Sequence, residues 1–358
     1  LVDTAGAWQL AERCARSFAS AGLPPVGKIE SVATHRVQGL WTGMGGIEEI
    51  LVTAEGGTEC SFIVKHVGTP NELDNFEFRR DHCSYAVEAC FYERGFADRL
   101  CAAGCRCPLP LLVDRKEEGI LKICMTKLHG EAFDGEDEAQ VHAALDWLAA
   151  LHAFFWGPAR ADAAVASGLQ PQGCYWHLDA RQKELAEMPA EGIDGRHRLA
   201  AVALDARLKA DRLQTICHGD AKGANILSDT EADVALFDFQ WTGKAPLTKD
   251  LAYFMACGAS GVTPTSEEGF LRHYLGSLAA RLDEQGDTPP TFEELRESYA
   301  LACADLARWM AGWGWWGNPP LLRHHVQAVL DRLDGGKAHG SEREYHERVF
   351  ALFPTRAA

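Results

Sequence analysis

The strand-like and helix-like stretches of this sequence are separated along the chain, and this separation limits its fold more than any other feature. Between residues 28 and 67, three stretches rich in β-branched residues follow one another, "KIESVATHRV", "EEILVTAE" and "CSFIVKHV", with "QGLWTGMGG" and "GGTE" between them. Such a pattern predicts a three-stranded antiparallel meander. Two further strands are expected in "CPLPLLVD" and "GILKICMTKL", after a helix over about residues 75–102.

From about residue 135 onward the pattern is mainly helical. Helices are expected over residues 138–156, 178–213, 266–283, 292–311 and 321–333. One compact strand-loop-strand stretch, "TICHGDAKGANILSDTEADVALFDF", interrupts them. We therefore predict an α+β protein with two lobes. Residues 1–124 would form a small antiparallel-sheet lobe with one helix, residues 125–130 a hinge, and residues 131–358 a large, mainly helical lobe.

The overall charge narrows the choice of partners. The 358 residues carry a net charge of −16, which disfavours nucleic acid and anionic membranes and modestly favours cationic small molecules. No run of about 18 apolar residues occurs, so membrane insertion is not expected, and no secretory signal is seen. The twelve cysteines are scattered without a CxxC pair, which is typical of a cytoplasmic or another reducing compartment.

The strand-loop-strand stretch holds the residues with the clearest chemistry. Phosphoryl transfer needs a positioned acceptor hydroxyl, a divalent metal on the phosphates and cations that balance charge. In "HGDAKGAN", Asp220 is a candidate to orient and deprotonate the hydroxyl, and Lys222 to reach the phosphoryl group. Asn225 and Asp238 offer hard oxygen ligands, which Mg²⁺ prefers. The sequence thus suggests catalytic residues beside a magnesium site.

This spacing resembles the signature of the protein-kinase-like superfamily. Within it, "HGDAKGANIL", "FDFQWTG" and "KDLAYF" are most similar to the aminoglycoside phosphotransferase, choline kinase and ecdysteroid-kinase-like (CHK kinase-like) families. Gln240 replaces the usual glycine after Asp-Phe, as in the ecdysteroid-kinase-like branch. The resemblance implies a bilobal protein-kinase-like fold, with ATP and Mg²⁺ as cofactors. It also implies that Asp250 braces the catalytic loop.

The resemblance further implies a phosphate-binding lysine in the first lobe. Lys65 ends the third expected strand, where such folds place the lysine that contacts the α- and β-phosphates. Its expected ion-pair partner is Glu88 in "YAVEACFYE", with Glu93 and Glu77 as alternatives on the same helix.

Two backbone features of the first lobe are expected to contact the nucleotide. In "GLWTGMGG", Gly43 and Gly45 belong to a loop that would cover the phosphates through its N–H groups, although a plain hairpin turn explains it equally well. The connector containing Met125 and Lys127 would read adenine through its backbone.

The short path from Asp238 to Asp250 indicates a small acceptor. Only "FQWTGKAPLTK" separates them, which leaves no room for a peptide platform. We therefore expect the phosphoryl acceptor to be a small-molecule alcohol, and the acidic composition favours a cationic amino alcohol. Asp305 would receive its ammonium group or be an exposed helix acid.

Four tryptophans near the end of the chain leave a similar choice open. Indole faces attract ammonium groups, and helical spacing also suits packing in a core. These residues are Trp309, Trp313, Trp315 and Trp316. The alternative to an active kinase is a catalytically silent kinase-like binding or scaffold protein. The acceptor's identity and the oligomeric state stay open.

Overall fold

The computed structural model describes residues 4–68, 75–115, 120–230 and 233–355. Gly119, Glu231 and Ala232, which fall in predicted strands or the loop between them, lie outside these ranges. The chain divides into two compact units, one of residues 1–102 and 107–129, the other of residues 103–106 and 130–358. The first contains an antiparallel sheet and the second is mainly helical, which confirms the predicted fold class. The hinge role of residues 125–130 stays a prediction.

The sheet of the first unit has five antiparallel strands in the order β1-β2-β3-β5-β4. They are β1 (Ile29–Gly39), β2 (Gly45–Ala54), β3 (Thr58–Val67), β4 (Pro110–Arg115) and β5 (Leu121–Thr126). The first three form the predicted meander, and β5 returns beside β3, with Lys65 opposite Ile123.

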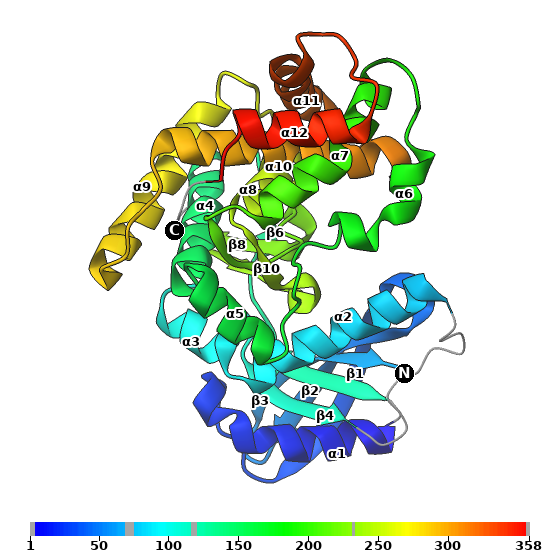
Figure 1. The fold of residues 1–358 in the computed structure, drawn as a ribbon. Helices are drawn as coiled ribbons and strands as arrows, with labels where there is room; N and C mark the ends of the chain where they lie inside the picture. Colours follow the sequence, from blue (N-terminus) through cyan, green and yellow to red (C-terminus); the bar gives the residue numbers. More distant parts are fainter. Residues whose placement is uncertain (1–3, 69–74, 116–119, 231–232, 356–358) are drawn as a thin grey trace. The chain divides into compact units, whose positions relative to one another are not determined.

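Helices cover both faces of this sheet (Figure 1). The helix α1 (Thr4–Cys14) packs on the face that carries Ile50, Phe62 and Val64. Since successive side chains of a strand point to opposite faces, Lys65 lies on the other face. There it meets α2 (Phe76–Glu93).

The helix predicted over residues 75–102 is two helices. α2 ends at Glu93, and α3 (Phe96–Ala102) follows after Gly95, whose φ is 65°. A left-handed residue cannot continue an α-helix, so the chain changes direction there. Glycine is thus the local cause of the break.

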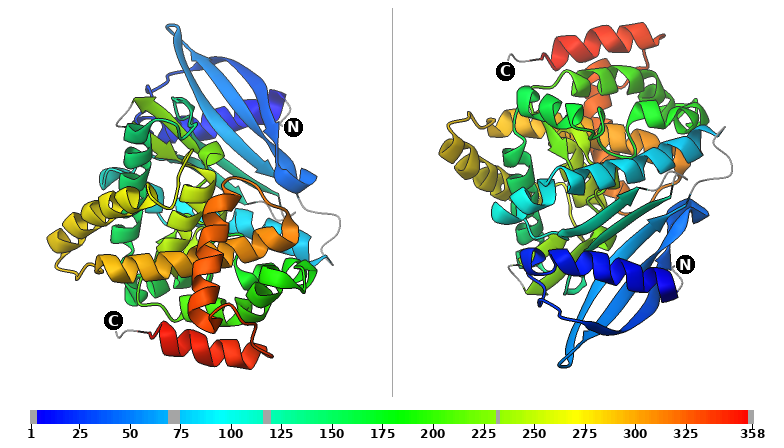
Figure 2. Two further views of the ribbon diagram at one scale, coloured as in Figure 1. Left: turned by 90° about the horizontal axis from the view of Figure 1, so that it is seen from above. Right: turned by 90° about the horizontal axis from the view of Figure 1, so that it is seen from below.

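The second unit consists of helices grouped around α10, which packs against α7, α8 and α11 (Figures 1 and 2). They are α4 (Glu138–Phe154), α5 (Pro158–Ala166), α6 (Gln182–Glu187), α7 (Gly192–Lys209), α8 (Thr248–Cys257), α9 (Glu267–Gln285), α10 (Phe292–Trp313), α11 (Pro319–Asp334) and α12 (Glu342–Leu352). The predicted helical stretch 178–213 is interrupted between α6 and α7. Among the described residues, none of the helices combines the length and apolar character that crossing a bilayer requires.

Five short strands of this unit position the candidate catalytic residues. β7 (Gln214–Cys217) pairs with β10 (Gly243–Pro246), while β8 (Ile226–Thr230) forms a hairpin with β9 (Asp233–Leu236) and also pairs with β6 (Glu131–Ala132). Residues 218–225 therefore form the loop from β7 to β8, and Asp238 lies two residues after the end of β9.

Candidate active site

The loop of residues 218–225 is anchored by a buried carboxylate. Asp250, in the first turn of α8, accepts the backbone N–H groups of His218 at 2.6 Å and Gly219 at 2.9 Å. Nε2 of His152 lies 3.2 Å from the same carboxylate. Burial opposes its ionisation, but these partners outweigh burial and lower the pKa of Asp250. The expected bracing of the loop by Asp250 is confirmed.

Gly219 allows the loop to pass close to a neighbouring backbone. Its φ is 85°, and a Cβ atom there would lie 2.2 Å from the carbonyl oxygen of Trp241. Only glycine fits this conformation and this approach.

Asp220 is buried, and one of its carboxylate oxygens contacts two side chains. Its Oδ2 accepts Nδ2 of Asn225 at 2.8 Å and lies 3.0 Å from Nζ of Lys222. Its Oδ1 is buried and accepts no hydrogen bond from the described residues. Burial, assisted by the negative charge of Asp238 and opposed by Lys222, raises the pKa of Asp220 to about 6. This carboxyl group is thus suited to taking up a proton near neutral pH.

His218 connects the loop to the end of β9. Its Nδ1 accepts the N–H of Asp220 at 3.3 Å, and its Nε2 lies 3.1 Å from the carbonyl oxygen of Phe237. These partners assign the neutral tautomer with the proton on Nε2. Burial lowers the pKa of His218, in agreement with a neutral ring that positions the loop.

Asn225 and Asp238 are brought together by the hairpin. The N–H of Phe237 donates to the carbonyl oxygen of Asn225 at 3.1 Å, one residue before Asp238. Asp238 has φ 71° and ψ 65°, a left-handed conformation that is uncommon for residues other than glycine. Such strain persists where the surroundings enforce it, often at functional sites. A carboxylate and an amide beside one another are a donor set that fits Mg²⁺.

In the first unit, Lys65 and Glu88 form a buried ion pair. Nζ of Lys65 lies 2.5 Å from Oε2 of Glu88, and the two residues are 4% and 1% exposed. The ring of Tyr85 lies 5.3 Å from the same ammonium group. Glu93 instead pairs with Arg115 at 3.0 Å. Of the acids considered from the sequence, Glu88 is the one that the structure places against Lys65.

The glycine-rich loop of the first unit is a compact turn. The N–H of Gly43 donates to the carbonyl oxygen of Leu40 at 3.1 Å. A Cβ at Gly45 would lie 1.9 Å from the carbonyl oxygen of His66, so this position requires glycine. The phosphate-covering role of both glycines stays a prediction.

The two connector residues lie at the end of the sheet. Met125 is inside β5, where the hydroxyl of Tyr92 lies 3.5 Å from its sulfur. Nζ of Lys127 pairs with Glu49 at 2.9 Å. Their role in adenine binding also stays a prediction.

Asp305 corrects the sequence analysis. It is 1% exposed, with Lys249 at 2.9 Å and Arg308 at 2.8 Å from its carboxylate. It is therefore not an exposed helix acid, and two cations of the chain already occupy the place suggested for an ammonium group.

Three of the four tryptophans, Trp309, Trp313 and Trp316, lie in an aromatic cluster that already contains a cation, whereas the ring of Trp315 lies 4.3 Å from the guanidinium of Arg323. Trp309 is 2% exposed, with its ring 4.8 Å from Tyr175 and 4.6 Å from Trp316. The guanidinium of Arg181 lies 5.4 Å from the rings of Tyr175 and Trp309 and 6.0 Å from Trp313. No signal near Arg181 in the sequence pointed to this contact.

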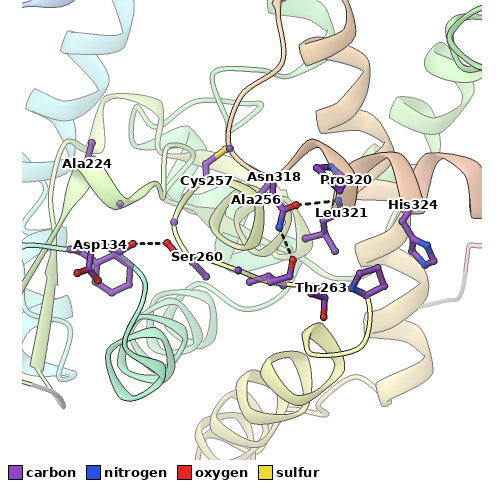
Figure 3. A pocket seen from close by; sticks show the side chains of 18 residues that line it. Asp134, Ala224, Ala256, Cys257, Ser260, Thr263, Asn318, Pro320, Leu321 and His324 are labelled. Carbon is purple, nitrogen blue, oxygen red and sulfur yellow. Dashed lines mark hydrogen bonds between the residues drawn. The ribbon is translucent and has the colours of Figure 1, made fainter.

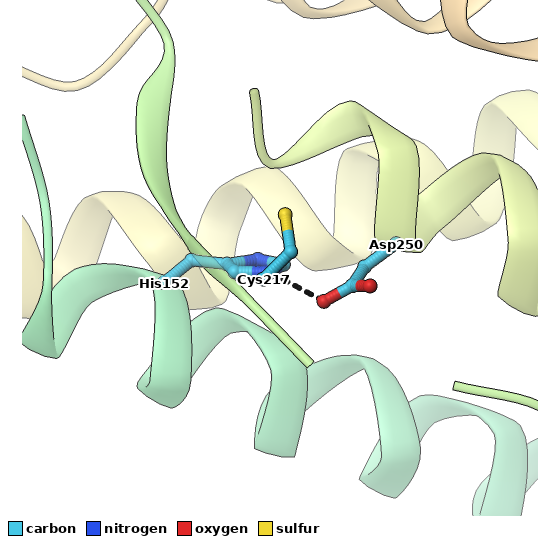
Figure 4. Close-up of side chains that lie close together, drawn as sticks. All are labelled: His152, Cys217 and Asp250. Carbon is cyan, nitrogen blue, oxygen red and sulfur yellow. Dashed lines mark hydrogen bonds and ion pairs between the residues drawn. The ribbon is translucent and has the colours of Figure 1, made fainter. Parts of the chain in front are cut away.

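His152, Cys217 and Asp250 form a further buried cluster, which sequence reasoning missed (Figure 4). Among the described residues it is the one group of three with metal-ligand geometry. Its polar atoms have protein partners: the hydroxyl of Tyr274 lies 2.8 Å from Nδ1 of His152, and Cys217 donates to Pro246 at 3.5 Å. The cluster therefore supports the loop.

Comparison with known proteins adds a family. The sequence pattern of the phosphotransferase enzyme family matches residues 55–287. This span contains Lys65, Glu88 and the loop with Asp220, but neither Gly43 nor the four tryptophans. None of the curated proteins matches the sequence.

Solved structures of low identity are similar along most of the chain. A macrolide 2'-phosphotransferase from Brachybacterium faecium is 17% identical, with 99% of each chain covered and a TM-score of 0.46. A choline kinase from Streptococcus pneumoniae is 18% identical, with 90% of this chain and 96% of that chain covered and a TM-score of 0.46. An ethanolamine kinase from Plasmodium vivax is 12% identical, with coverages of 84% and 82% and a TM-score of 0.46.

Proposed function

We propose, since this chain belongs to the phosphotransferase enzyme family, that it transfers the γ-phosphoryl group of ATP to a hydroxyl of a small molecule. The observation that carries this proposal is the state of Asp220. It is buried, one oxygen is held by Lys222 and Asn225, and the other accepts no hydrogen bond from the described residues. A carboxylate held in this way is prepared for a hydroxyl donor.

Each functional residue of the loop has a separate role in the phosphoryl transfer. The acceptor hydroxyl donates to Oδ1 of Asp220, which orients it and takes its proton as the new bond to the γ-phosphorus forms and the bond from that phosphorus to the bridging oxygen of the leaving ADP breaks. Lys222 places a positive charge beside the transferred group. Asn225 and Asp238 would hold Mg²⁺, which supplies charge neutralisation at the phosphates when it is bound.

Lys65 supplies the cation of the first unit. A lysine has many rotamers, and the sheet and Glu88 together fix the position of its ammonium group. In this proposal, the fixed ammonium group contacts the phosphates of ATP.

The test is a screen for ATP-dependent phosphorylation. Purified protein with Mg²⁺ and ATP is offered amino alcohols, aminoglycosides, sterols and sugars, and products that gain one phosphoryl group are detected by mass spectrometry. We expect transfer to at least one class, lost in Asp220→Asn and kept in Asp162→Asn, whose side chain is 62% exposed. Binding of Mg-ATP without transfer in the whole screen would favour the silent scaffold instead.

A further inference from the structure

We propose that Cys101 and Cys107 are a redox-sensitive thiol pair, which a low-molecular-weight disulfide converts reversibly into an intramolecular disulfide. The Sγ atoms of the two residues lie 3.4 Å apart, and neither residue is in a disulfide. The sulfur atoms of a disulfide are about 2.0 Å apart, so closing the bond needs an approach of about 1.4 Å. This inference is independent of the proposed function, because it concerns another part of the chain and another reaction.

A tight return of the chain brings the two cysteines together. Cys101 is the last residue but one of α3, which ends at Ala102. Gly104 follows with a φ of 91°, the left-handed conformation that commonly reverses the chain after a helix. Cys107 then lies beside the last turn of α3, with its Sγ 3.8 Å from the carbonyl oxygen of Ala97. The local backbone thus holds the two sulfur atoms in contact.

The two thiols differ in exposure and in acidity, which separates their roles. Cys101 is half-buried, whereas Cys107 is 3% exposed. Hydrogen bonding from Cys107 lowers the pKa of Cys101 to about 7, although burial opposes its ionisation. Since the thiolate is the reactive form of cysteine, a large fraction of Cys101 is reactive at neutral pH. Cys101 is therefore the nucleophile that meets an external disulfide first, and Cys107 is the thiol that resolves the product.

The reaction consists of two thiol–disulfide exchanges, written here with oxidised glutathione as the external disulfide. The thiolate of Cys101 attacks one sulfur of oxidised glutathione, the S–S bond of glutathione breaks, and one glutathione leaves and takes up the proton that Cys101 released. Cys107 then loses its proton, its sulfur attacks Sγ of Cys101, and the second glutathione leaves with that proton. The thiol pair is oxidised by two electrons, and the glutathione disulfide is reduced to two thiols.

Other cysteines show that contact or exposure alone is not sufficient. Cys105 lies between the two residues in the sequence, but its thiol donates to the carbonyl oxygen of Trp147 at 3.7 Å. Cys14 and Cys124 interact in the core of the first unit, where both are fully buried, and the hydrogen bond with Cys124 and burial raise the pKa of Cys14 far above its usual value. Cys257 lines a cavity of the second unit (Figure 3), but burial raises its pKa to about 12.

The experiment follows the thiols of the full chain by peptide mass spectrometry. Reduced protein is incubated with oxidised glutathione at neutral pH, the remaining thiols are blocked with N-ethylmaleimide in denaturant, and the chain is digested with trypsin. Because trypsin cleaves after Arg106, Cys101 and Cys107 fall in separate peptides. We expect a disulfide to join these two peptides and dithiothreitol to separate them. Cys105 shares the peptide of Cys101, so Cys105→Ser is treated in the same way and should give the same joined peptides.

Single substitutions test the two roles. In Cys107→Ser, Cys101 should keep a bound glutathione, because no second thiol displaces it. In Cys101→Ser, neither a glutathione adduct nor joined peptides should form at this place, because Cys107 is buried. Cys83, which is exposed on α2, is the control and should carry a stable glutathione adduct in all variants. The melting temperature of each variant shows that it is folded.

Alkylation rates in the wild-type protein test the reactivity of Cys101 directly. Cys257 is half-buried like Cys101 and is the matched comparison, because its pKa is raised to about 12. We expect iodoacetamide to modify Cys101 at neutral pH at least about tenfold faster than Cys257, since only Cys101 has an appreciable thiolate fraction. The rate at Cys101 should rise with pH and reach half its maximum near pH 7.

The outcomes that overturn the inference are distinct from a failure of the proposed function. A glutathione adduct that persists on Cys101 of the wild type would show that Cys107 does not resolve it. Joined peptides that disappear in Cys105→Ser, or that form only in urea, would also overturn the pair, as would alkylation of Cys101 no faster than that of Cys257. None of these measurements involves phosphoryl transfer, so either proposal can fail while the other stands.

Discussion

Asp220 and Asp305 are two buried carboxylates of the same unit whose surroundings act in opposite directions. Asp305 lies against Lys249 and Arg308, and although burial opposes its ionisation, these cations hold its pKa below the usual range. Asp220 has one partly exposed lysine and a nearby negative charge, and burial raises its pKa to about 6.

The difference separates a structural acid from a chemical one. In Asp305 each carboxylate oxygen faces a buried cation, with Oδ2 2.9 Å from Lys249 and Oδ1 2.8 Å from Arg308, so the group serves packing and specificity. Asp220 differs, because its Oδ1 accepts no hydrogen bond from the described residues and can still accept one from a substrate hydroxyl. Perturbation of this kind is concentrated at functional sites. The two residues should therefore respond to substitution in opposite ways.

The largest expected effect concerns a third acid, Asp238, which is only half-buried. Asp238→Ala should abolish phosphoryl transfer, because it removes a proposed metal ligand, and should leave the melting temperature nearly unchanged. Transfer is measured at saturating Mg-ATP. Asp233→Ala, at the start of β9, is the control and should stay active. Near-normal turnover of Asp238→Ala would show that this residue is no metal ligand.

Asp220→Asn should lower kcat by at least about 10²-fold with little change in ATP affinity, because only the acceptor's proton is affected. Its stability at neutral pH should equal or exceed that of the wild type, because a buried charge is removed. Turnover and chemical denaturation test the two statements. If ATP binding were lost while the rate at saturation was kept, Asp220 would instead be a metal ligand.

Asp305→Asn should destabilise the fold by about 3–5 kcal/mol, since it leaves two buried cations without their carboxylate. Urea denaturation measures the change. The matched control is Glu293→Gln on the same helix, where Glu293 pairs with Arg296 at the surface with the same three-residue spacing. That change should cost less than about 1 kcal/mol. Similar losses in both variants would refute the distinction between them.

Glu88→Ala should weaken transfer by about tenfold or more, because the ammonium group of Lys65 loses the partner that fixes it. Glu93→Ala on the same helix is the control, since Glu93 contacts Arg115 at the surface. Steady-state kinetics with varied ATP should show the loss for Glu88 alone. A larger effect of Glu93→Ala would mean that the functional partner of Lys65 is another acid than the one seen in this structure.

The sequence predicted what is local and missed what distant segments bring together. The loop of residues 218–225 is short and lies between strands, so its residue order alone placed Asp220, Lys222 and Asn225 near one another. Lys65 was assigned through the resemblance to kinase-like folds, and the alternation of β3 in the structure places it on the face opposite Phe62 and Val64.

Only one of the two cations around Asp305 could be predicted from the sequence. Arg308 is three residues away on the same helix, a spacing that signals a pair. Lys249 lies in α8 and Arg181 lies outside the helix that carries Trp309. The contacts of Lys249 with Asp305 and of Arg181 with Trp309 therefore could not be predicted from the spacing of residues in the sequence.

The smallest expected effect is in pH dependence, and it tests the opposite pKa shifts directly. If the ionised form of Asp220 is the base, kcat/KM should rise by about tenfold between pH 5 and 7, with a midpoint near 6.

The same raised pKa of Asp220 makes the free energy of unfolding depend on pH. The stability linked to this proton is present below pH 4 and is lost as pH rises through about 6. The lowered pKa of Asp305 has the reverse sign, with stability present above pH 4 and lost as the pH falls further. In metal-free protein, Asp220→Asn should therefore gain stability over the wild type between pH 4 and 7. A gap that stays constant across this range would contradict the raised pKa of Asp220 and with it the contrast between the two acids.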